Sequence, residues 1–190
     1  MSPSPRPAVV LVPVKAFSQA KMRLSSVLTP AERAALARKL AERVVSAARP
    51  LPVAVVCDDG EVATWAQSLG AHVLSEPGVG LNAAVAAALS QLGSEGYGRV
   101  VVAHGDLPLA TNLAWLAEEQ GIVLVPDRHR DGTNVISLPA RCGFRFSYGP
   151  GSFVRHQQEA ERTGTAWKIV YDDALGWDVD LPADMSAVAL

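Results

Sequence analysis

The sequence predicts a single α/β domain with a mainly parallel central sheet and helices on both of its faces. Continuous apolar segments alternate with segments of helical periodicity, which is typical of strands joined by right-handed crossovers. The length of 190 residues favours one domain spanning residues 1–190, because a chain of this size buries about 70% of its unfolded surface around one core. A content of 49% hydrophobic and 19% charged residues is that of a folded globular protein.

The first strand and the first helix are indicated by different patterns. Residues Ala8 to Val14 form an unbroken apolar run, which is typical of a strand covered on both faces. Thr29 to Glu32 combine a helix N-cap, a proline at the first helical position and a glutamate three residues after the cap. Leu36 and Leu40 follow at helical spacing, so we expect one buried helix face. Met1 to Pro7 are expected to be flexible.

The later elements repeat the same alternation. Strands are expected at Val53–Cys57, His72–Leu74, Arg99–Ala103, Ile122–Val125, Asn134–Leu138 and Trp167–Tyr171, and helices at Gly60–Leu69, Leu81–Leu92 and beyond Ser152 through His156 and Ala160. Ligands bind at the carboxyl ends of the strands in sheets of this type. Polar loops that follow strands are therefore the candidate functional segments.

Composition excludes several classes of function. The formal net charge of −2 and the pI near 6.1 lack the basic excess that attracts nucleic acids. No apolar run reaches the roughly 20 residues that span a bilayer, and no signal-type stretch is present, so we expect a cytoplasmic protein with no membrane association. Cys57 and Cys142 are too few and too distant for a metal site or a disulfide framework, and we expect reduced thiols.

The loop after the first strand carries three cations. Lys15, Lys21 and Arg23 lie at the carboxyl end of a central strand, which indicates a site for a triphosphate. The loop matches neither the phosphate-loop motif with its glycines and lysine nor the dinucleotide-binding glycine fingerprint. The alternative interpretation is a solvated basic turn.

Three aspartates are candidate metal ligands. Asp106 follows the buried run that ends at Ala103, and Asp178 and Asp180 have the i, i+2 spacing that points two side chains the same way in an extended segment. Carboxylate oxygens suit Mg²⁺, and three of them could hold two ions between the phosphates of a donor and an acceptor. The alternatives are a turn former or helix cap at Asp106 and surface acids near the C-terminus.

Other loops offer weaker signals. Gly149 to Phe153 precedes a helix, where glycines let backbone amides approach an anion and Ser152 can cap the helix, although simple helix entry explains the pattern equally. Asp127 to Asn134 contains an Asp-Gly turn, and its arginines could bind phosphate or merely solvate a hairpin. Glu76 to Asn82 could approach the edge of a base through its glycines.

Taken in chain order, these segments resemble the phospholactate and phosphoenolpyruvate guanylyltransferases of coenzyme F420 biosynthesis. The match covers nearly the whole chain, and its specificity lies in the order of the motifs because none is decisive singly. The matching segments are Pro13–Lys15 with Ala20–Leu24, Gly80–Asn82, Gly105–Pro108, Asp127–Arg128 with Gly132–Asn134, Gly149–Phe153 with His156, and Asp178–Asp180. The resemblance implies a Rossmann-like nucleotidyltransferase fold.

The resemblance also implies roles for individual residues. Asp106, Asp178 and Asp180 would bind Mg²⁺, as two ions, while Lys15 and Arg23 would join Asp106 in catalysis. The acceptor's phosphate and carboxylate would be held by Thr133, Gly149 and Ser152. The nucleotide would be bound by Lys15, Lys21, Arg23, Leu81 and Asn82.

The implied activity is transfer of GMP from GTP to phosphoenolpyruvate with release of pyrophosphate. Alternatives are the same chemistry on 2-phospho-L-lactate, 3-phosphoglycerate or a molybdopterin-like phosphate, and a non-catalytic nucleotide-binding or protein-interaction module. The partners would be GTP and a small phosphorylated carboxylic acid, and assembly as a homodimer stays open. The chain departs from the family pattern at Leu181, at Ala183 and at Arg130-Asp131, positions that would surround the ligands and not bind them directly.

Overall fold

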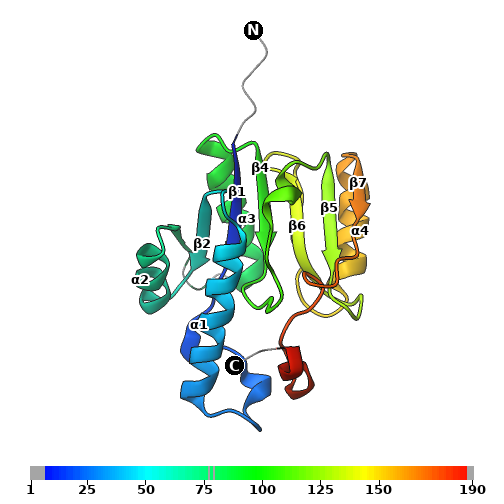
Figure 1. Cartoon of the computed structure of the whole chain (residues 1–190). Coiled ribbons are helices and arrows are strands. Elements are labelled where there is room, and N and C mark those ends of the chain that lie inside the picture. Colours follow the sequence, from blue (N-terminus) through cyan, green and yellow to red (C-terminus); the bar gives the residue numbers. More distant parts are fainter. Residues whose placement is uncertain (1–6, 77, 79, 188–190) are drawn as a thin grey trace.

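The computed structural model describes residues 7–76, 78 and 80–187, which form one sheet with helices on both faces (Figure 1). The strands are β1 (Ala8–Pro13), β2 (Val53–Cys57), β3 (His72–Ser75), β4 (Arg99–Ala103), β5 (Ile122–Pro126), β6 (Thr133–Pro139) and β7 (Trp167–Ile169). The α-helices are α1 (Pro30–Ala47), α2 (Gly60–Ser68), α3 (Gly80–Ser94) and α4 (Ser152–Thr163). Short 3-10 helices are η1 (Phe17–Gln19), η2 (Met22–Leu24), η3 (Ala114–Ala117) and η4 (Pro182–Ala187).

The strand order explains where a ligand can enter. The order is β3-β2-β1-β4-β6-β5-β7, and β6 alone among the described strands runs antiparallel to its neighbours. The chain passes from β1 to β2 on one side and returns to β4 on the other side of β1. The carboxyl ends of β1 and β4 therefore flank a topological switch point, where open α/β sheets bind ligands.

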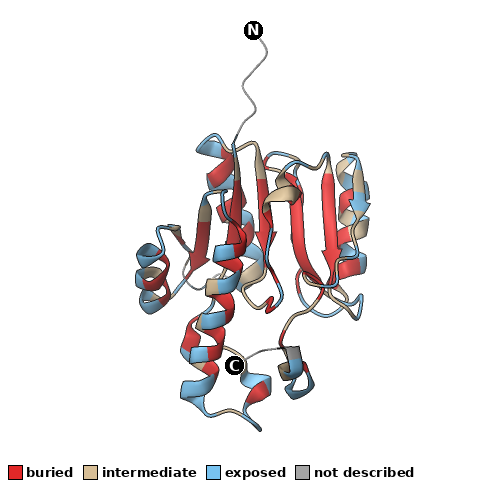
Figure 2. Ribbon diagram, in the orientation of Figure 1, coloured by how far each residue is buried: buried red, intermediate tan, exposed pale blue. Residues whose placement is uncertain are grey.

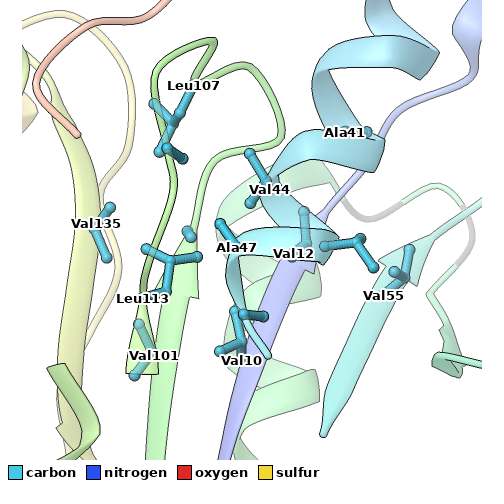
Figure 3. Packing of buried hydrophobic residues seen from close by; sticks show 14 of the residues in the cluster. Val10, Val12, Ala41, Val44, Ala47, Val55, Val101, Leu107, Leu113 and Val135 are labelled. Carbon is cyan, nitrogen blue, oxygen red and sulfur yellow. The ribbon is translucent and has the colours of Figure 1, made fainter. Parts of the chain in front are cut away.

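The core has two main layers because neighbouring residues of each strand point to opposite faces of the sheet. Figure 2 shows β5 and β6 coloured as buried along most of their length. Val10 and Val12 pack toward α1, where Val44 and Ala47 lie close to them, and Val55 of β2 extends the same layer (Figure 3). On the other face the alternate strand residues pack against the buried sides of α3 and α4. The predicted fold class, with its mainly parallel sheet covered on both faces, is confirmed.

Most of the predicted elements match the structure to within a few residues. The capping box of α1 is present: the Thr29 hydroxyl accepts from the backbone N–H of Glu32, and the Glu32 carboxylate accepts from the backbone N–H of Thr29. Both cysteines are free thiols. Of the stretch Met1 to Pro7, only Pro7 lies within the described residues. No helix in the described part of the chain is long and apolar enough to cross a membrane.

Candidate active site

A pocket of about 610 Å³ lies at the carboxyl ends of β1, β2 and β4. Its wall includes the loop after β1 from residue 13 to residue 23, the start of α3 at Leu81, and the segment His104–Asp106 after β4. Asp180 reaches it from the C-terminal segment. The volume falls in the usual range for small-molecule sites, and the position is the switch point of the sheet.

Lys21 brings two of the predicted aspartates together. Its ammonium lies 2.6 Å from Oδ2 of Asp106 and 3.5 Å from Oδ1 of Asp180, and it donates to the carbonyl of Val179 at 2.6 Å. The Val179 amide in turn donates to the Asp106 carbonyl at 3.2 Å. The C-terminal segment therefore lies against the end of β4, although the two are more than 70 residues apart in sequence.

The charges at this point are unevenly balanced. Burial and the nearby charges of Asp106 and Asp180 raise the pKa of Asp178 to about 6. Burial opposes ionisation of Asp106, but the Lys21 ammonium prevails and holds its pKa below the ordinary range. Burial acts to lower the pKa of Lys21, but the neighbouring Asp106 carboxylate outweighs burial, so the pKa of Lys21 is raised. Three carboxylates thus share one buried cation, an arrangement that favours additional positive charge.

The donor set fits a magnesium ion. Oδ1 of Asp106 is buried and has no hydrogen-bond partner among the described residues. Asp180 and Asp178 supply further carboxylate oxygens from the neighbouring segment, and Mg²⁺ takes oxygen ligands of this kind. Within the described ranges, no three His, Cys, Asp or Glu side chains are already placed to hold an ion by themselves. Substrate phosphates and water would therefore have to complete the coordination.

The other predicted cations differ in their surroundings. Lys15 is exposed and lines the pocket. Arg23 also lines the pocket, and its guanidinium lies 3.1 Å from Oδ2 of Asp180 with 68% of the side chain exposed. Lys21 has a φ of 55°, an uncommon left-handed conformation for a residue with a side chain. This backbone directs Lys21 inward to Asp106, while Lys15 and Arg23 stay accessible to a ligand.

The three residues predicted to hold the acceptor form a neighbouring cluster. Thr133 begins β6, and because that strand is antiparallel its start lies at the same edge of the sheet as the carboxyl ends of the other strands. Thr133 and Ser152 are each only 1% exposed, whereas Gly149 is exposed. Among the described residues, the wall of the 610 Å³ pocket includes none of these three. His104, whose amide donates to the Asn134 carbonyl, connects the pocket to this cluster.

His156 fixes the hydroxyl of Thr133. Nε2 of His156 accepts from the amide of Ser147 at 3.0 Å, so the proton of the neutral ring is on Nδ1. Nδ1–H then donates to the Thr133 hydroxyl oxygen at 3.0 Å. Burial lowers the pKa of His156 to about 4, which keeps the ring neutral near pH 7. The Thr133 hydroxyl retains its own proton to donate.

The start of α4 differs from the prediction. Ser152 does not cap the helix: it is the first helical residue, and Gly151, with a φ of 69°, is the N-cap without a side-chain cap. The Gly151 amide donates to both carboxylate oxygens of Asp131, each at 3.1 Å. A glycine in the left-handed region ends the preceding loop, and a carboxylate from a distant loop provides the negative charge that a helix N-terminus attracts.

The two residues predicted near the nucleoside have different contacts. Leu81 lines the pocket. The side-chain amide of Asn82 is paired with the backbone of Tyr148, accepting from its N–H at 2.6 Å and donating to its carbonyl at 3.4 Å. Asn82 therefore ties the start of α3 to the loop before α4.

Sequence patterns did not show the contacts of Arg128 and did not single out Asp184. Arg128 was expected to bind phosphate or to be solvated, but its guanidinium contacts the Asp184 carboxylate and the Asp178 carbonyl. Asp184 is 2% exposed and was not singled out. The signal that could have found Asp184 is its place three residues after Leu181, the spacing at which a carboxylate accepts from amides at a helix start. The partner of Arg128 lies 56 residues away, beyond any local pattern.

Comparison with protein families and curated relatives gives a consistent result. Residues 8–190 match the family model described as guanylyl transferase, CofC-like. A phosphoenolpyruvate guanylyltransferase of Rubrobacter xylanophilus is 38% identical, with 93% of this chain and 90% of the relative covered. One from Sphaerobacter thermophilus is 35% identical, with 95% and 92% covered. A 2-phospho-L-lactate guanylyltransferase of Methanothermobacter thermautotrophicus is 33% identical, with 95% and 83% covered.

Solved structures of low sequence identity share the fold. A Desulfovibrio desulfuricans protein assigned to the nucleotide-diphospho-sugar transferases superposes with a TM-score of 0.72 at 17% identity, covering 92% of this chain and 82% of its own. A Methanothermobacter nucleotidyl transferase gives 0.63 at 15% identity, covering 95% and 94%. These similarities place the fold among the Rossmann-like nucleotidyltransferases.

Proposed function

The chain belongs to the CofC-like guanylyl transferase family, and from this premise we propose that it transfers GMP from GTP to phosphoenolpyruvate, releasing pyrophosphate, in the biosynthesis of coenzyme F420. The observation that carries the proposal is the convergence of Asp106, Asp178 and Asp180 beside a pocket lined by Lys15 and Arg23. Two relatives that are 35% and 38% identical to this chain are named for phosphoenolpyruvate, which favours that acceptor.

The reaction needs positioning and charge neutralisation rather than a protein nucleophile. An oxygen of the acceptor's phosphate attacks the α-phosphorus of GTP, forming a new P–O bond. The bond from the α-phosphorus to the oxygen that bridges to the β-phosphorus breaks, and pyrophosphate leaves with that electron pair. Lys15 and Arg23, which line the pocket, would offset the phosphate charge that grows on the leaving group.

Mg²⁺ is the proposed cofactor, held by Asp106, Asp178 and Asp180. When bound, it would neutralise phosphate oxygens and help to align donor and acceptor. In this scheme Lys21 orients Asp106 and Asp180 through the two ion pairs described above. Lys21 also lines the pocket in which the triphosphate of GTP is proposed to bind.

The acceptor is proposed to sit over the neighbouring cluster of Thr133, Gly149 and Ser152. The proposed contacts are the hydroxyls of Thr133 and Ser152 and the backbone at Gly149, because the amides of Gly151, Ser152 and Phe153 already donate within the protein. Hydroxyl donors of this kind suit a compact anion that carries both a phosphate and a carboxylate. Because 2-phospho-L-lactate differs from phosphoenolpyruvate only in two hydrogens and the planarity of one carbon, discrimination is expected to be modest, about 1–3 kcal/mol. The Methanothermobacter thermautotrophicus relative named for 2-phospho-L-lactate makes that acid the second candidate.

The test is a competition assay with product identification. The protein is incubated with GTP, Mg²⁺ and equal concentrations of phosphoenolpyruvate, 2-phospho-L-lactate and 3-phosphoglycerate, while pyrophosphate release is followed and products are identified by mass spectrometry. The guanylylated phosphoenolpyruvate should dominate. Preferential use of another acid would replace the acceptor, and no pyrophosphate with any of them would favour a non-catalytic nucleotide-binding module.

A further inference from the structure

We propose that the hairpin loop between β5 and β6, residues 127–132, is a two-sided positioning element for the active site. One side holds the C-terminal segment that carries Asp178 and Asp180, and the other side holds the loop that carries Gly149 and Ser152. Figure 1 shows the chain after β7 passing beside this end of β5 and β6 on its way to η4. The proposal rests on the function proposed above, because the two held segments are the proposed metal and acceptor sites.

The hairpin loop has a fixed shape of its own. Both carboxylate oxygens of Asp127 accept backbone amides, from Asp131 at 3.0 Å and from Gly132 at 2.7 Å. The Asp127 amide donates to the Gly132 carbonyl at 3.1 Å. A Cβ at Gly132 would lie 2.6 Å from the Asp127 carboxylate, so a larger residue would displace this arrangement. The loop can therefore hold the segments that it contacts in a fixed place relative to the sheet.

The first side of the loop is Arg128. Its backbone amide donates to the Gly176 carbonyl at 2.8 Å, and its guanidinium donates to the Asp178 carbonyl at 3.3 Å. The guanidinium also stacks over the Trp177 ring, 4.1 Å from the ring centroid, and pairs with the Asp184 carboxylate. Each of these contacts falls on the C-terminal segment. Arg128 is not among the described residues that line the pocket.

Asp184 extends the hold of Arg128 to the main chain beside Asp180. Its Oδ2 accepts from the amides of Asp180 at 2.8 Å and Leu181 at 2.6 Å, while its Oδ1 pairs with Arg128. The carbonyl of Asp178 and the amide of Asp180 are thus both fixed by the Arg128–Asp184 pair. Removing either partner would leave a charge poorly paired in a buried place and release the segment.

The second side of the loop is Asp131. Its carboxylate accepts the Gly151 amide through both oxygens at 3.1 Å, and its carbonyl accepts the Phe153 amide at 2.9 Å. These bonds fix the first turn of α4, including Ser152. Asp131 is exposed, so its contribution depends on this geometry rather than on burial.

We expect substitutions on the two sides of the loop to cause different defects in the full-length protein, one in metal binding and one in acceptor binding. Mn²⁺ binding to the nucleotide-free protein is followed by electron paramagnetic resonance. Arg128→Met is expected to weaken it about 10-fold or more, as for other residues that orient metal ligands, and Arg128→Lys should recover part of the loss. Amide exchange should rise in residues 178–184. The kcat should fall, while the KM for the phospho-acid changes little.

Asp131→Ala is the reciprocal variant. It should raise the KM for the phospho-acid and amide exchange in residues 151–153, and leave Mn²⁺ affinity as in the wild type. His129→Ala is the matched control, because His129 is an exposed residue of the same loop, and it should match the wild type in every measurement.

Unchanged Mn²⁺ affinity and unchanged exchange of residues 178–184 in Arg128→Met would overturn the first side of the proposal. Equal changes in both segments from both single variants would show a general loss of stability instead of two separate holds. If Arg128→Met does not fold, Arg128→Lys and Asp184→Asn decide the question by the same measurements. Mn²⁺ affinity and amide exchange can be measured without turnover. If the wild-type protein showed no guanylyl transfer, the proposed function would be refuted, but these two measurements would still test the role of the loop.

Discussion

Individual charges at the end of β4 decide what the pocket can bind. Asp106 meets the Lys21 ammonium with one carboxylate oxygen and leaves the other buried without a partner among the described residues. A neutral amide at this position would keep the size of the side chain but lose the charge that both a metal ion and Lys21 require. The position lies past the strand, outside the main apolar layers.

Asp106→Asn should therefore abolish activity without unfolding the protein. The expected loss in the rate of pyrophosphate release is more than about 100-fold, because a direct metal ligand should matter more than the partners that orient such ligands, whose loss costs about 10–100-fold. Circular dichroism should match that of the wild type, while the unfolding midpoint should fall because the buried Lys21 ammonium loses one of its charged partners. Glu61→Gln, an exposed change on α2, serves as the control. Pyrophosphate release near the wild-type rate in Asp106→Asn would remove Asp106 from the metal site.

His156 gives the protein a predicted dependence of stability on pH. Its pKa is about 4 in the folded protein because of burial, against about 6.5 when exposed, so the unfolded chain binds a proton that the folded protein rejects. The contribution of His156 to stability is complete above about pH 6.5 and is lost as the pH drops toward 4, by about 2 kcal/mol between pH 7 and 5. Burial lowers the pKa of His104 too, which adds in the same direction. Asp178 acts in the opposite direction, because its raised pKa of about 6 makes the folded protein bind a proton more readily than the unfolded chain, so the test compares the wild type with a His156 variant.

The measurement is urea unfolding at about pH 7 and pH 5 for the wild type and His156→Gln. The variant is expected to be less stable at neutral pH because the bonds to Thr133 and Ser147 are altered, but its stability should depend less on pH. The same pH dependence in both proteins would assign the effect to other groups.

Elements are predictable where local chemistry alone determines them. The apolar runs of β1, β2 and β4 and the capping box of α1 each consist of neighbours in sequence, and the structure matches them closely. The start of α4 shows the opposite case. Ser152 looks like a cap from its neighbours, but the positive φ of Gly151 and the carboxylate of Asp131 shift the helix start by one residue. That carboxylate comes from 20 residues away, so no local pattern contains it.

The capping box of α1 provides a test at the scale of one helix. Thr29→Ala removes the oxygen that accepts the Glu32 amide and frees the Glu32 carboxylate from its bond to the Thr29 hydroxyl. The free energy of unfolding is expected to fall by about 1 kcal/mol, within the range of 0.5–2 kcal/mol for such caps. Thr29→Ser should keep most of it. Chemical denaturation measures both, and equal stability of Thr29→Ala and the wild type would contradict the role of the box.

For the whole molecule, topology determines how much of the site the sequence could show. Lys15, Asp106 and Leu81 each follow or begin an element whose polarity the sequence indicates, so their gathering at one edge of the sheet was predictable. The pairing of Arg128 with Asp184 was not, because it requires the path of the chain after β7. Local pattern thus finds the residues that face the pocket more readily than those that hold the pocket together.

Binding of nucleotide and metal should stabilise the whole molecule, because the residues proposed to bind them come from β1, α3, β4 and the C-terminal segment. A ligand at about 100 times its Kd adds about 2.7 kcal/mol to the free energy of unfolding, which for a domain near this size raises the Tm by about 5–10 °C.

GTP with Mg²⁺ should give this full shift in Tm. GTP with EDTA should give a smaller shift, since the triphosphate then contacts Lys15 and Arg23 without the metal. ATP with Mg²⁺ should give less than GTP with Mg²⁺. Asp180→Asn should lose only the part that depends on Mg²⁺. Differential scanning fluorimetry measures all of these, and equal shifts with and without EDTA would show that the nucleotide binds independently of the aspartates.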